Sequence, residues 1–106
     1  MQKLNQIYIN GEFVTPHGTQ TLDLFSPINN EKIAEVTLGD EIDVQNAVHS
    51  AREAFKTFSQ TSKAERISYL TALHEVFKKH KDALVNTMML EYGCPRYFTE
   101  LLIQGG

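Results

Sequence analysis

Residues 32–48, KIAEVTLGDEIDVQNAV, contain the transition that decides the fold of this chain. Up to Leu38 the side chains alternate with a period of two, which is typical of a strand with one better-buried face. After Gly39 the apolar side chains recur at every third or fourth position, which is typical of an amphipathic helix, and Asp40 stands where an N-cap is needed. One stripe of this helix carries Ala47, Val48, Ala51, Ala54, Phe55 and Phe58. The pattern predicts strands before residue 39 and helices after it.

The segment before this transition has the signals of a hairpin followed by a pair of strands. Asn10-Gly11 separates two short apolar runs, and this dipeptide tolerates the positive φ angles that a two-residue hairpin turn requires. Residues 21–25 alternate again, and Pro27 and Asn30 predict a turn before the next strand begins.

The segment after the transition has the start and stop signals of further helices. Ser62 and Glu65 have the spacing of a capping box, so a helix is predicted to start there. The polar run 78–82 predicts an end or a bend, Gly93 suits a left-handed C′ position, and Pro95 suits the first turn of a last helix. The residues expected to face inward are Ile67, Leu70, Leu73, Val76 and Phe77, followed by Leu84, Val85, Met88 and Met89.

Composition excludes several classes of protein. The 106 residues suffice for one domain, which at this size can bury roughly two-thirds of the surface of its unfolded chain. The net charge is −3, and the acidic and basic residues are intermixed, so neither nucleic acid nor a membrane is an expected partner. No apolar stretch approaches the ~20 residues of a membrane span, and the N-terminus lacks the apolar core of a secretory signal. Because Cys94 is the single cysteine, we expect no internal disulfide and a cytoplasmic location.

Side chains that could carry chemistry are scattered along the sequence. Cys94 has no base at local spacing that would activate its thiol, so an ordinary turn cysteine is the favoured interpretation. The histidines lack the i, i+4 spacing of a helical metal pair, and no glycine-rich phosphate loop occurs. These histidines are His17, His49, His74 and His80. The sequence therefore predicts no catalytic and no cofactor-binding residue in this chain.

Short motifs nevertheless follow one another along nearly the whole chain. They are residues 9–14 (INGEFV), 25–27 (FSP), 31–36 (EKIAEV), 44–55 (VQNAVHSAREAF), 65–70 (ERISYL) and 91–95 (EYGCP). Each motif is weak alone, but in this order and at these intervals they resemble the N-terminal portion of the NAD(P)-dependent aldehyde dehydrogenase superfamily. Cys94 stands where that family usually has lysine, and Phe58 stands where it often has tryptophan. These departures leave the expected fold intact and the subfamily open.

The resemblance implies an α/β fold and an enzyme as the parent protein. Residues 1–106 would form the N-terminal part of a Rossmann-type cofactor-binding domain, with a hairpin and a strand pair at about 6–38 and about four amphipathic helices at about 41–106. The catalytic domain would be absent from this span. The parent would oxidise aldehydes to carboxylic acids with NAD or NADP, through a cysteine nucleophile and a glutamate base that come later in the family. We therefore expect this span to be structural and inactive alone, and Cys94 not to be the nucleophile.

The resemblance also implies a ligand pair and partners. Some relatives hold a monovalent cation with a backbone carbonyl at the position of Phe25 and a carboxylate at that of Glu91, which fits the preference of hard cations for oxygen. The competing interpretation is that Glu91 is simply solvated near a helix end. The implied partners are the remainder of the same chain, a small aldehyde, and further copies in a homodimer or homotetramer.

A self-sufficient helical module that recruits a protein partner is the alternative, from a different class of function. The apolar stripes at 47–58 and 84–89 would be adhesive if nothing covered them. A reading frame of the family's length would favour the enzyme, whereas a compact monomer that unfolds cooperatively would favour the module.

Overall fold

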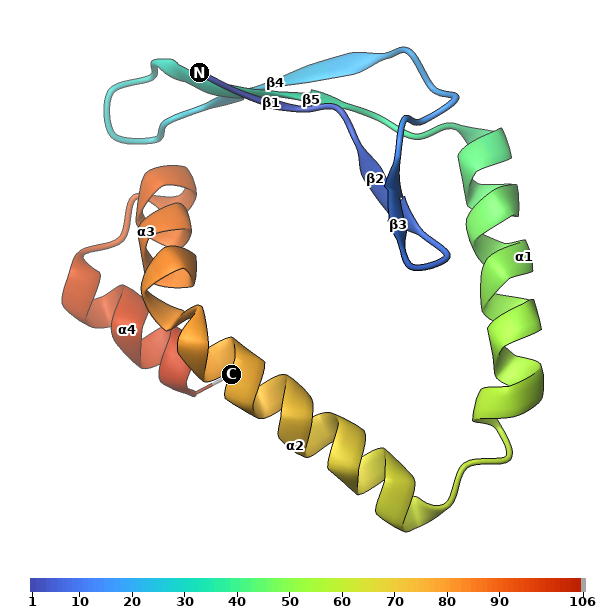
Figure 1. Cartoon of the computed structure of the whole chain (residues 1–106). Helices are drawn as coiled ribbons and strands as arrows, with labels where there is room; N and C mark the ends of the chain where they lie inside the picture. Colours follow the sequence, from blue (N-terminus) through green and yellow to red (C-terminus); the bar gives the residue numbers. More distant parts are fainter. Residues whose placement is uncertain (106) are drawn as a thin grey trace. The chain divides into compact units, whose positions relative to one another are not determined.

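The computed structural model describes residues 1–105, which form five strands and four helices. The described chain, whose strands and helices are labelled in Figure 1, separates into two compact units. The first unit comprises residues 1–24 and 32–61, and the second comprises residues 25–31 and the chain from residue 62 onward. The predicted fold class, strands followed by helices in an α/β protein, is confirmed.

Two small sheets form the strand part of the chain. The strands are β1 (Gln2–Leu4), β2 (Ile7–Ile9), β3 (Glu12–Val14), β4 (Thr21–Phe25) and β5 (Lys32–Thr37). One sheet has the order β1-β5-β4, and the other is the antiparallel hairpin β2-β3. The hairpin turn is confirmed, because Asn10 and Gly11 have φ angles of 55° and 81°. Strand β1, which pairs in parallel with β5, has no counterpart among the predicted strands.

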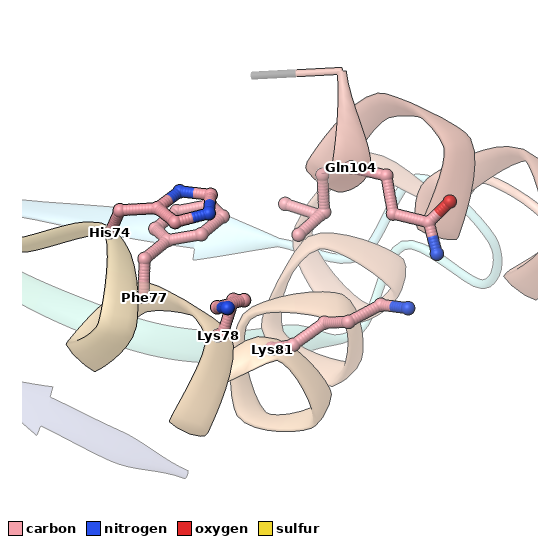
Figure 2. Close-up of a pocket in the computed structure, with 6 residues that line it drawn as sticks. His74, Phe77, Lys78, Lys81 and Gln104 are labelled. Atoms are coloured by element: carbon pink, nitrogen blue, oxygen red, sulfur yellow. The ribbon is translucent and has the colours of Figure 1, made fainter. Parts of the chain in front are cut away.

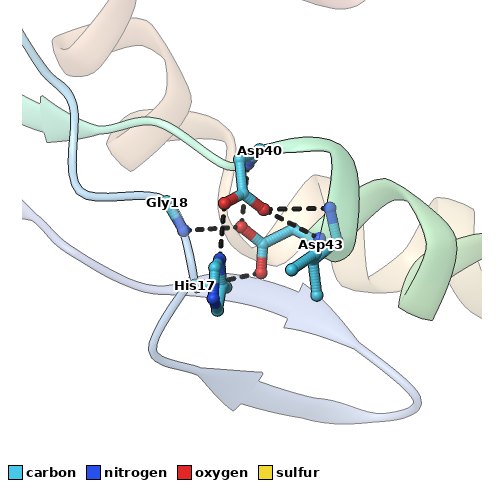
Figure 3. Close-up of polar contacts among 5 residues, drawn as sticks. His17, Gly18, Asp40 and Asp43 are labelled. Atoms are coloured by element: carbon cyan, nitrogen blue, oxygen red, sulfur yellow. Dashed lines mark hydrogen bonds and ion pairs between the residues drawn. The ribbon is translucent and has the colours of Figure 1, made fainter.

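The helix α1 (Glu41–Phe58) begins at the predicted N-cap, and a polar cluster fixes this end (Figure 3). The carboxylate of Asp40 accepts hydrogen bonds from the backbone N–H groups of Ile42 and Asp43. The Asp43 carboxylate accepts three backbone N–H bonds in return, from His17 at 2.8 Å, Gly18 at 3.0 Å and Asp40 at 2.9 Å. Asp43 is buried, and it joins the loop before β4 to the first turn of α1.

These contacts shift the ionisation of two groups in the cluster. The backbone donors of His17, Gly18 and Asp40 lower the pKa of Asp43 to about 2, because they stabilise its charged form. The hydrogen bond from Nδ1 of His17 to the Asp40 carboxylate, 2.5 Å long, raises the pKa of the imidazole above its ordinary value. Asp43 therefore stabilises the fold above its unfolded-state pKa, and this contribution is lost as the pH falls through the folded value.

Three helices make up most of the second unit. They are α2 (Lys63–Lys79), α3 (Lys81–Tyr92) and α4 (Arg96–Gln104). The predicted capping box at the start of α2 is confirmed, since Ser62 and Glu65 exchange hydrogen bonds of 3.1 and 2.6 Å. The predicted break falls at His80, between α2 and α3. Helix α4 begins one residue after Pro95, which acts as its N-cap residue instead of lying in its first turn.

The core of the second unit is small and lies where α3, α4 and the 25–31 turn meet. Val85 of α3 and Thr99 of α4 are fully buried, and Thr99 donates its hydroxyl hydrogen to the carbonyl oxygen of Pro95. Ser26 is also buried, and its backbone N–H closes the turn on the carbonyl of Glu31 at 2.8 Å.

The prediction that the apolar side chains of α2 face inward is wrong for this chain. No residue of α2 is buried, and Leu70 and Leu73 are 66% and 62% exposed. Apolar side chains recur along the sequence of α2 with a period near 3.6, but the helix is only weakly amphipathic. Burial also requires a second layer, and the described residues provide none for this helix. Among the described residues only Ala34 and Val85 are buried apolar side chains.

Gly93 ends α3 in the predicted left-handed conformation, with φ at 76°, and it lies against the 25–31 turn. A Cβ atom at this position would be 2.9 Å from Cγ of Pro27. Both the backbone conformation and the close contact therefore require glycine here.

We expect Gly93→Ala to lower the free energy of unfolding by more than Gly11→Ala does. Left-handed strain costs about 1–2 kcal/mol for an L-residue, and it applies at both positions. Only Gly93 adds a steric contact, because a Cβ atom at Gly11 would meet nothing within 4 Å. Urea denaturation followed by circular dichroism measures both variants. Equal losses would show that the contact with Pro27 contributes nothing.

We expect acid to destabilise the wild-type chain between about pH 5 and pH 2, as the Asp43 carboxylate gains a proton. Asp43→Asn should be less stable at pH 7 and should show a flatter profile over this interval, because one acceptor oxygen becomes a donor that faces backbone N–H groups. Thermal unfolding at a series of pH values measures this. Glu41→Gln is the matched control, since it removes an exposed carboxylate from the same helical turn. If Asp43→Asn loses stability in acid as the wild-type chain does, protonation of Asp43 is not the cause of the acid destabilisation.

Candidate functional site

The two predicted cation ligands, Phe25 and Glu91, both belong to the second unit and lie at the ends of different elements. Phe25 is the last residue of β4, and Glu91 lies in the last turn of α3. Within the described part of the chain, the Glu91 carboxylate has no hydrogen bond and no ion pair, and no such contact joins it to Phe25. Glu91 is exposed.

The backbone segments that follow these two residues lie side by side. Pro27, two residues after Phe25, approaches Gly93, two residues after Glu91, closely enough to exclude a Cβ atom. A hydrogen bond closes the 25–31 turn that carries Pro27: Asn30 has a φ of 59°, and its N–H donates to the carbonyl of Ser26 at 2.8 Å. The chain thus brings the FSP and EYG motifs together, although they are far apart in the sequence.

Cys94 and the histidines form no comparable site in the described residues. Cys94 is half-buried in the connection between α3 and α4, and its thiol has no hydrogen-bond partner among residues 1–105. His17 is engaged by Asp40, as described above. In the described part of the chain, no group of three or more His, Cys, Asp or Glu side chains is arranged so that it could hold a metal ion.

Two neighbouring apolar hollows line one side of α2, and sequence analysis did not predict them. One has a volume of about 270 Å³, and Figure 2 shows the side chains around it. It is lined by His74, Phe77, Lys78, Lys81, Ile103 and Gln104. The second, of about 230 Å³, shares His74 and Phe77 and is otherwise lined by Leu70 and Leu73.

The chemistry of these hollows suits binding and offers no catalytic pair. Leu70, Leu73 and Phe77 of α2 and Ile103 of α4 supply the apolar side chains of their walls. The polar side chains are those of His74, Gln104, Lys78 and Lys81, the last of which begins α3. Lys78 is already paired with Glu75 at 2.8 Å, whereas Lys81 has no ion pair with any described residue. The apolar residues of α2 are the sequence signal from which the hollows could have been predicted. The hollow shared with the end of α4 depends on tertiary structure, which this signal does not specify.

Helices that could cross a membrane are not found among the described residues, since none combines sufficient length with sufficient apolarity.

Comparison with known proteins accounts for nearly the whole chain. The model of the aldehyde dehydrogenase family matches residues 13–105. A putative aldehyde dehydrogenase of Staphylococcus aureus (strain bovine RF122 / ET3-1) is 32% identical over 100 residues, which are 94% of this chain and 21% of that protein. The chain therefore spans about a fifth of the length of such relatives.

Solved structures show the same relation. The crystal structure of aldehyde dehydrogenase from Bartonella henselae matches with a TM-score of 0.90 and 28% identity, over 93% of this chain and 21% of that one. A point mutant of betaine aldehyde dehydrogenase from Staphylococcus aureus, in complex with NAD+, matches with a TM-score of 0.84 and 29% identity, over 94% of this chain and 20% of that one. The resemblance to the N-terminal portion of the family is confirmed, and this chain belongs to the aldehyde dehydrogenase family.

Proposed function

We propose that this chain is the N-terminal segment of an oxidoreductase that oxidises aldehydes to carboxylic acids with NAD or NADP. The observation that carries the proposal is the family match over residues 13–105. The relatives support the activity, since they include a putative aldehyde dehydrogenase and a betaine aldehyde dehydrogenase in complex with NAD+. The parent enzyme acts on a small aldehyde in the cytoplasm, as a homodimer or homotetramer.

Within this enzyme the segment has a structural role and no catalytic one. Aldehyde oxidation through a thiolate needs a nucleophile with an activating base and donors that stabilise an oxyanion. The one thiol of the chain, Cys94, has no hydrogen-bonded base among residues 1–105. No glycine-rich phosphate loop occurs in the sequence, so no residue is assigned to NAD(P). Residues 1–106 are the N-terminal part of the cofactor-binding domain, and the catalytic domain lies outside this span.

A monovalent cation is the one ligand that we assign to this segment. The carbonyl oxygen of Phe25 and the carboxylate of Glu91 are the donors, and oxygen is the ligand that hard cations prefer. Two features support the pair: the Glu91 carboxylate has no partner among the described residues, and the contact between Pro27 and Gly93 holds the two motifs together. The ion would tie the end of β4 to the end of α3.

A self-sufficient helical binding module is the second candidate function. The exposed apolar side chains of α1 and α2 favour it, because an uncovered apolar face is adhesive. A module of this kind would be monomeric and would unfold in one cooperative transition, whereas a segment that depends on further layers would aggregate or bind a hydrophobic dye.

We expect the isolated chain to give no aldehyde-dependent reduction of NAD+ or NADP+, and the covalently continuous enzyme that contains it to give such turnover. The absorbance of NAD(P)H measures both. Turnover by the isolated chain would contradict the structural role. Absence of turnover from the continuous enzyme across a panel of aldehydes would contradict the proposed reaction.

We expect potassium or sodium chloride to stabilise the chain more than choline chloride does at equal ionic strength. An ion at ten times its Kd adds on the order of 1 kcal/mol to the stability of the state that binds it. Glu91→Gln should remove the difference, and Glu12→Gln, which changes an exposed carboxylate of the hairpin, should preserve it. Thermal unfolding in the three salts measures this. The same response in Glu91→Gln as in wild type would overturn the cation assignment.

A further inference from the structure

The side chain of His17 lies between the 15–20 loop and the start of α1, and all of these residues belong to the first unit. The Asp43 carboxylate holds the backbone of this loop, because its two oxygens accept the N–H groups of His17 and Gly18. The Asp40 carboxylate holds the ring, since Nδ1 of His17 is 2.5 Å from its Oδ2 (Figure 3). Two carboxylates at one helix end therefore attach the loop, one through its backbone and one through an imidazole.

The two oxygens of the Asp40 carboxylate have separate partners. Oδ1 accepts the N–H groups of Ile42 and Asp43, at 3.0 and 3.2 Å, and so caps the helix. Oδ2 contacts the imidazole of His17. The contact with the ring can therefore be lost while the cap of α1 remains.

The loop is closely packed on the segment that leads into α1. Gly18 is buried, and a Cβ atom at this position would overlap the carbonyl oxygen of Leu38. The N–H of Leu38 donates to the carbonyl of Gln20 at 2.8 Å, which closes the end of the loop. The His17 ring lies at the open edge, with 60% of its side chain exposed. Solvent therefore has free access to the imidazole, while the backbone beside it is confined.

The contact with Asp40 depends on the charge of the ring. The carboxylates of Asp40 and Asp43, both at the start of α1, face the imidazole, and the 15–20 loop contains no other titratable side chain. The positive end of the helix dipole opposes a cation at this place. The hydrogen bond and the charge of Asp40 prevail, so the pKa of His17 lies above its ordinary value of 6.5. The resulting stability is fully present below the unfolded pKa of 6.5 and is lost as the pH rises through the folded pKa.

We propose that His17 and Asp40 form a proton-dependent latch, which holds the 15–20 loop against the start of α1 while the imidazole is charged and releases it when the proton leaves. Release loosens the backbone bonds of His17 and Gly18 to Asp43, and it leaves the cap of α1 in place. Because the loop joins β3 to β4, the latch makes the freedom of the connection between the two sheets depend on pH. This response is distinct from that of Asp43, whose pKa of about 2 places its own titration in acid.

Backbone hydrogen exchange of the 106-residue chain, followed by NMR, tests the latch. The protection factor of an amide compares its exchange with that of an unstructured peptide at the same pH, so it reports opening alone. We expect the protection of the His17 and Gly18 N–H groups to fall between about pH 6 and about pH 8.5. The ring pKa, measured in the same samples, fixes the size of this fall, which is about tenfold for each pH unit by which the ring pKa exceeds 6.5.

Exchange in low concentrations of urea distinguishes release of the loop from unfolding of the unit. Opening of a short loop exposes little surface, so low urea should leave the exchange of His17 and Gly18 nearly unchanged. The N–H of Val48, in the middle of α1, is the reference for unfolding. A urea response of the loop equal to that of Val48 would overturn the latch.

Three variants separate the ring contact from its surroundings. Asp40→Asn keeps the cap, because asparagine caps helices about as well as aspartate does, but it removes the charge. It should return the pKa of His17 toward 6.5 and largely remove the pH dependence of the loop, with unchanged helix content by circular dichroism. His17→Gln should leave the protection of Gly18 constant over the same pH interval. His49→Gln, which removes an exposed histidine of α1, is the matched control and should behave as the wild type.

The remaining outcomes identify a different cause. If Asp40→Asn keeps the full pH dependence and His17→Gln loses it, the ring acts through Asp43, and the latch with Asp40 is overturned. If His17→Gln keeps the pH dependence, the imidazole is not the group that titrates, and the proposal is overturned as well. A wild-type ring that titrates at or below pH 6.5 would have the same consequence.

Discussion

The Asp43 carboxylate is the interaction on which the arrangement of the first unit depends. It collects three backbone N–H groups from two places in the chain, His17 and Gly18 in one loop and Asp40 at the start of α1. Little apolar burial supports this unit, since Ala34 is the one buried apolar side chain among its described residues. Polar caps and closed turns therefore hold the elements at their ends, while the apolar sides of the helices stay available.

In the second unit, too, caps and turns fix the ends of the elements. The capping box of Ser62 and Glu65 starts α2, left-handed Gly93 ends α3, and Asn30 closes the turn that packs against Gly93. Each device fixes a boundary or a change of direction without help from a large core. We expect such local devices in a layer whose apolar side packs against another layer. The coverage agrees with this, because the chain matches about a fifth of the length of its relatives.

Features set by local chemistry could be predicted from the sequence, and features set by tertiary contacts could not. Three features depend on only a few adjacent residues: the hairpin turn at Asn10-Gly11, the capping box of Ser62 and the end of α3 at Gly93. The local sequence pattern was therefore sufficient to predict each of them. Strand β1 was missed because three residues without alternation become a strand only by pairing with β5. The inward orientation of α2 was predicted from periodicity, which identifies the apolar side but not whether a partner layer is present. Phe25 and Glu91 were predicted from family resemblance alone. The hollow that reaches Ile103 also needs the end of α4, whose position the sequence does not give.

The parallel pairing of β1 with β5 sets an order of events during synthesis. Gln2 is opposite Ala34, and the whole β2-β3 hairpin lies between them along the chain. On the ribosome, residues 7–14 can close their hairpin soon after they emerge, because only a two-residue turn separates the strands. The amino-terminal strand must wait until the middle of this chain is available, so its first residues stay accessible to proteases and nascent-chain factors throughout that interval.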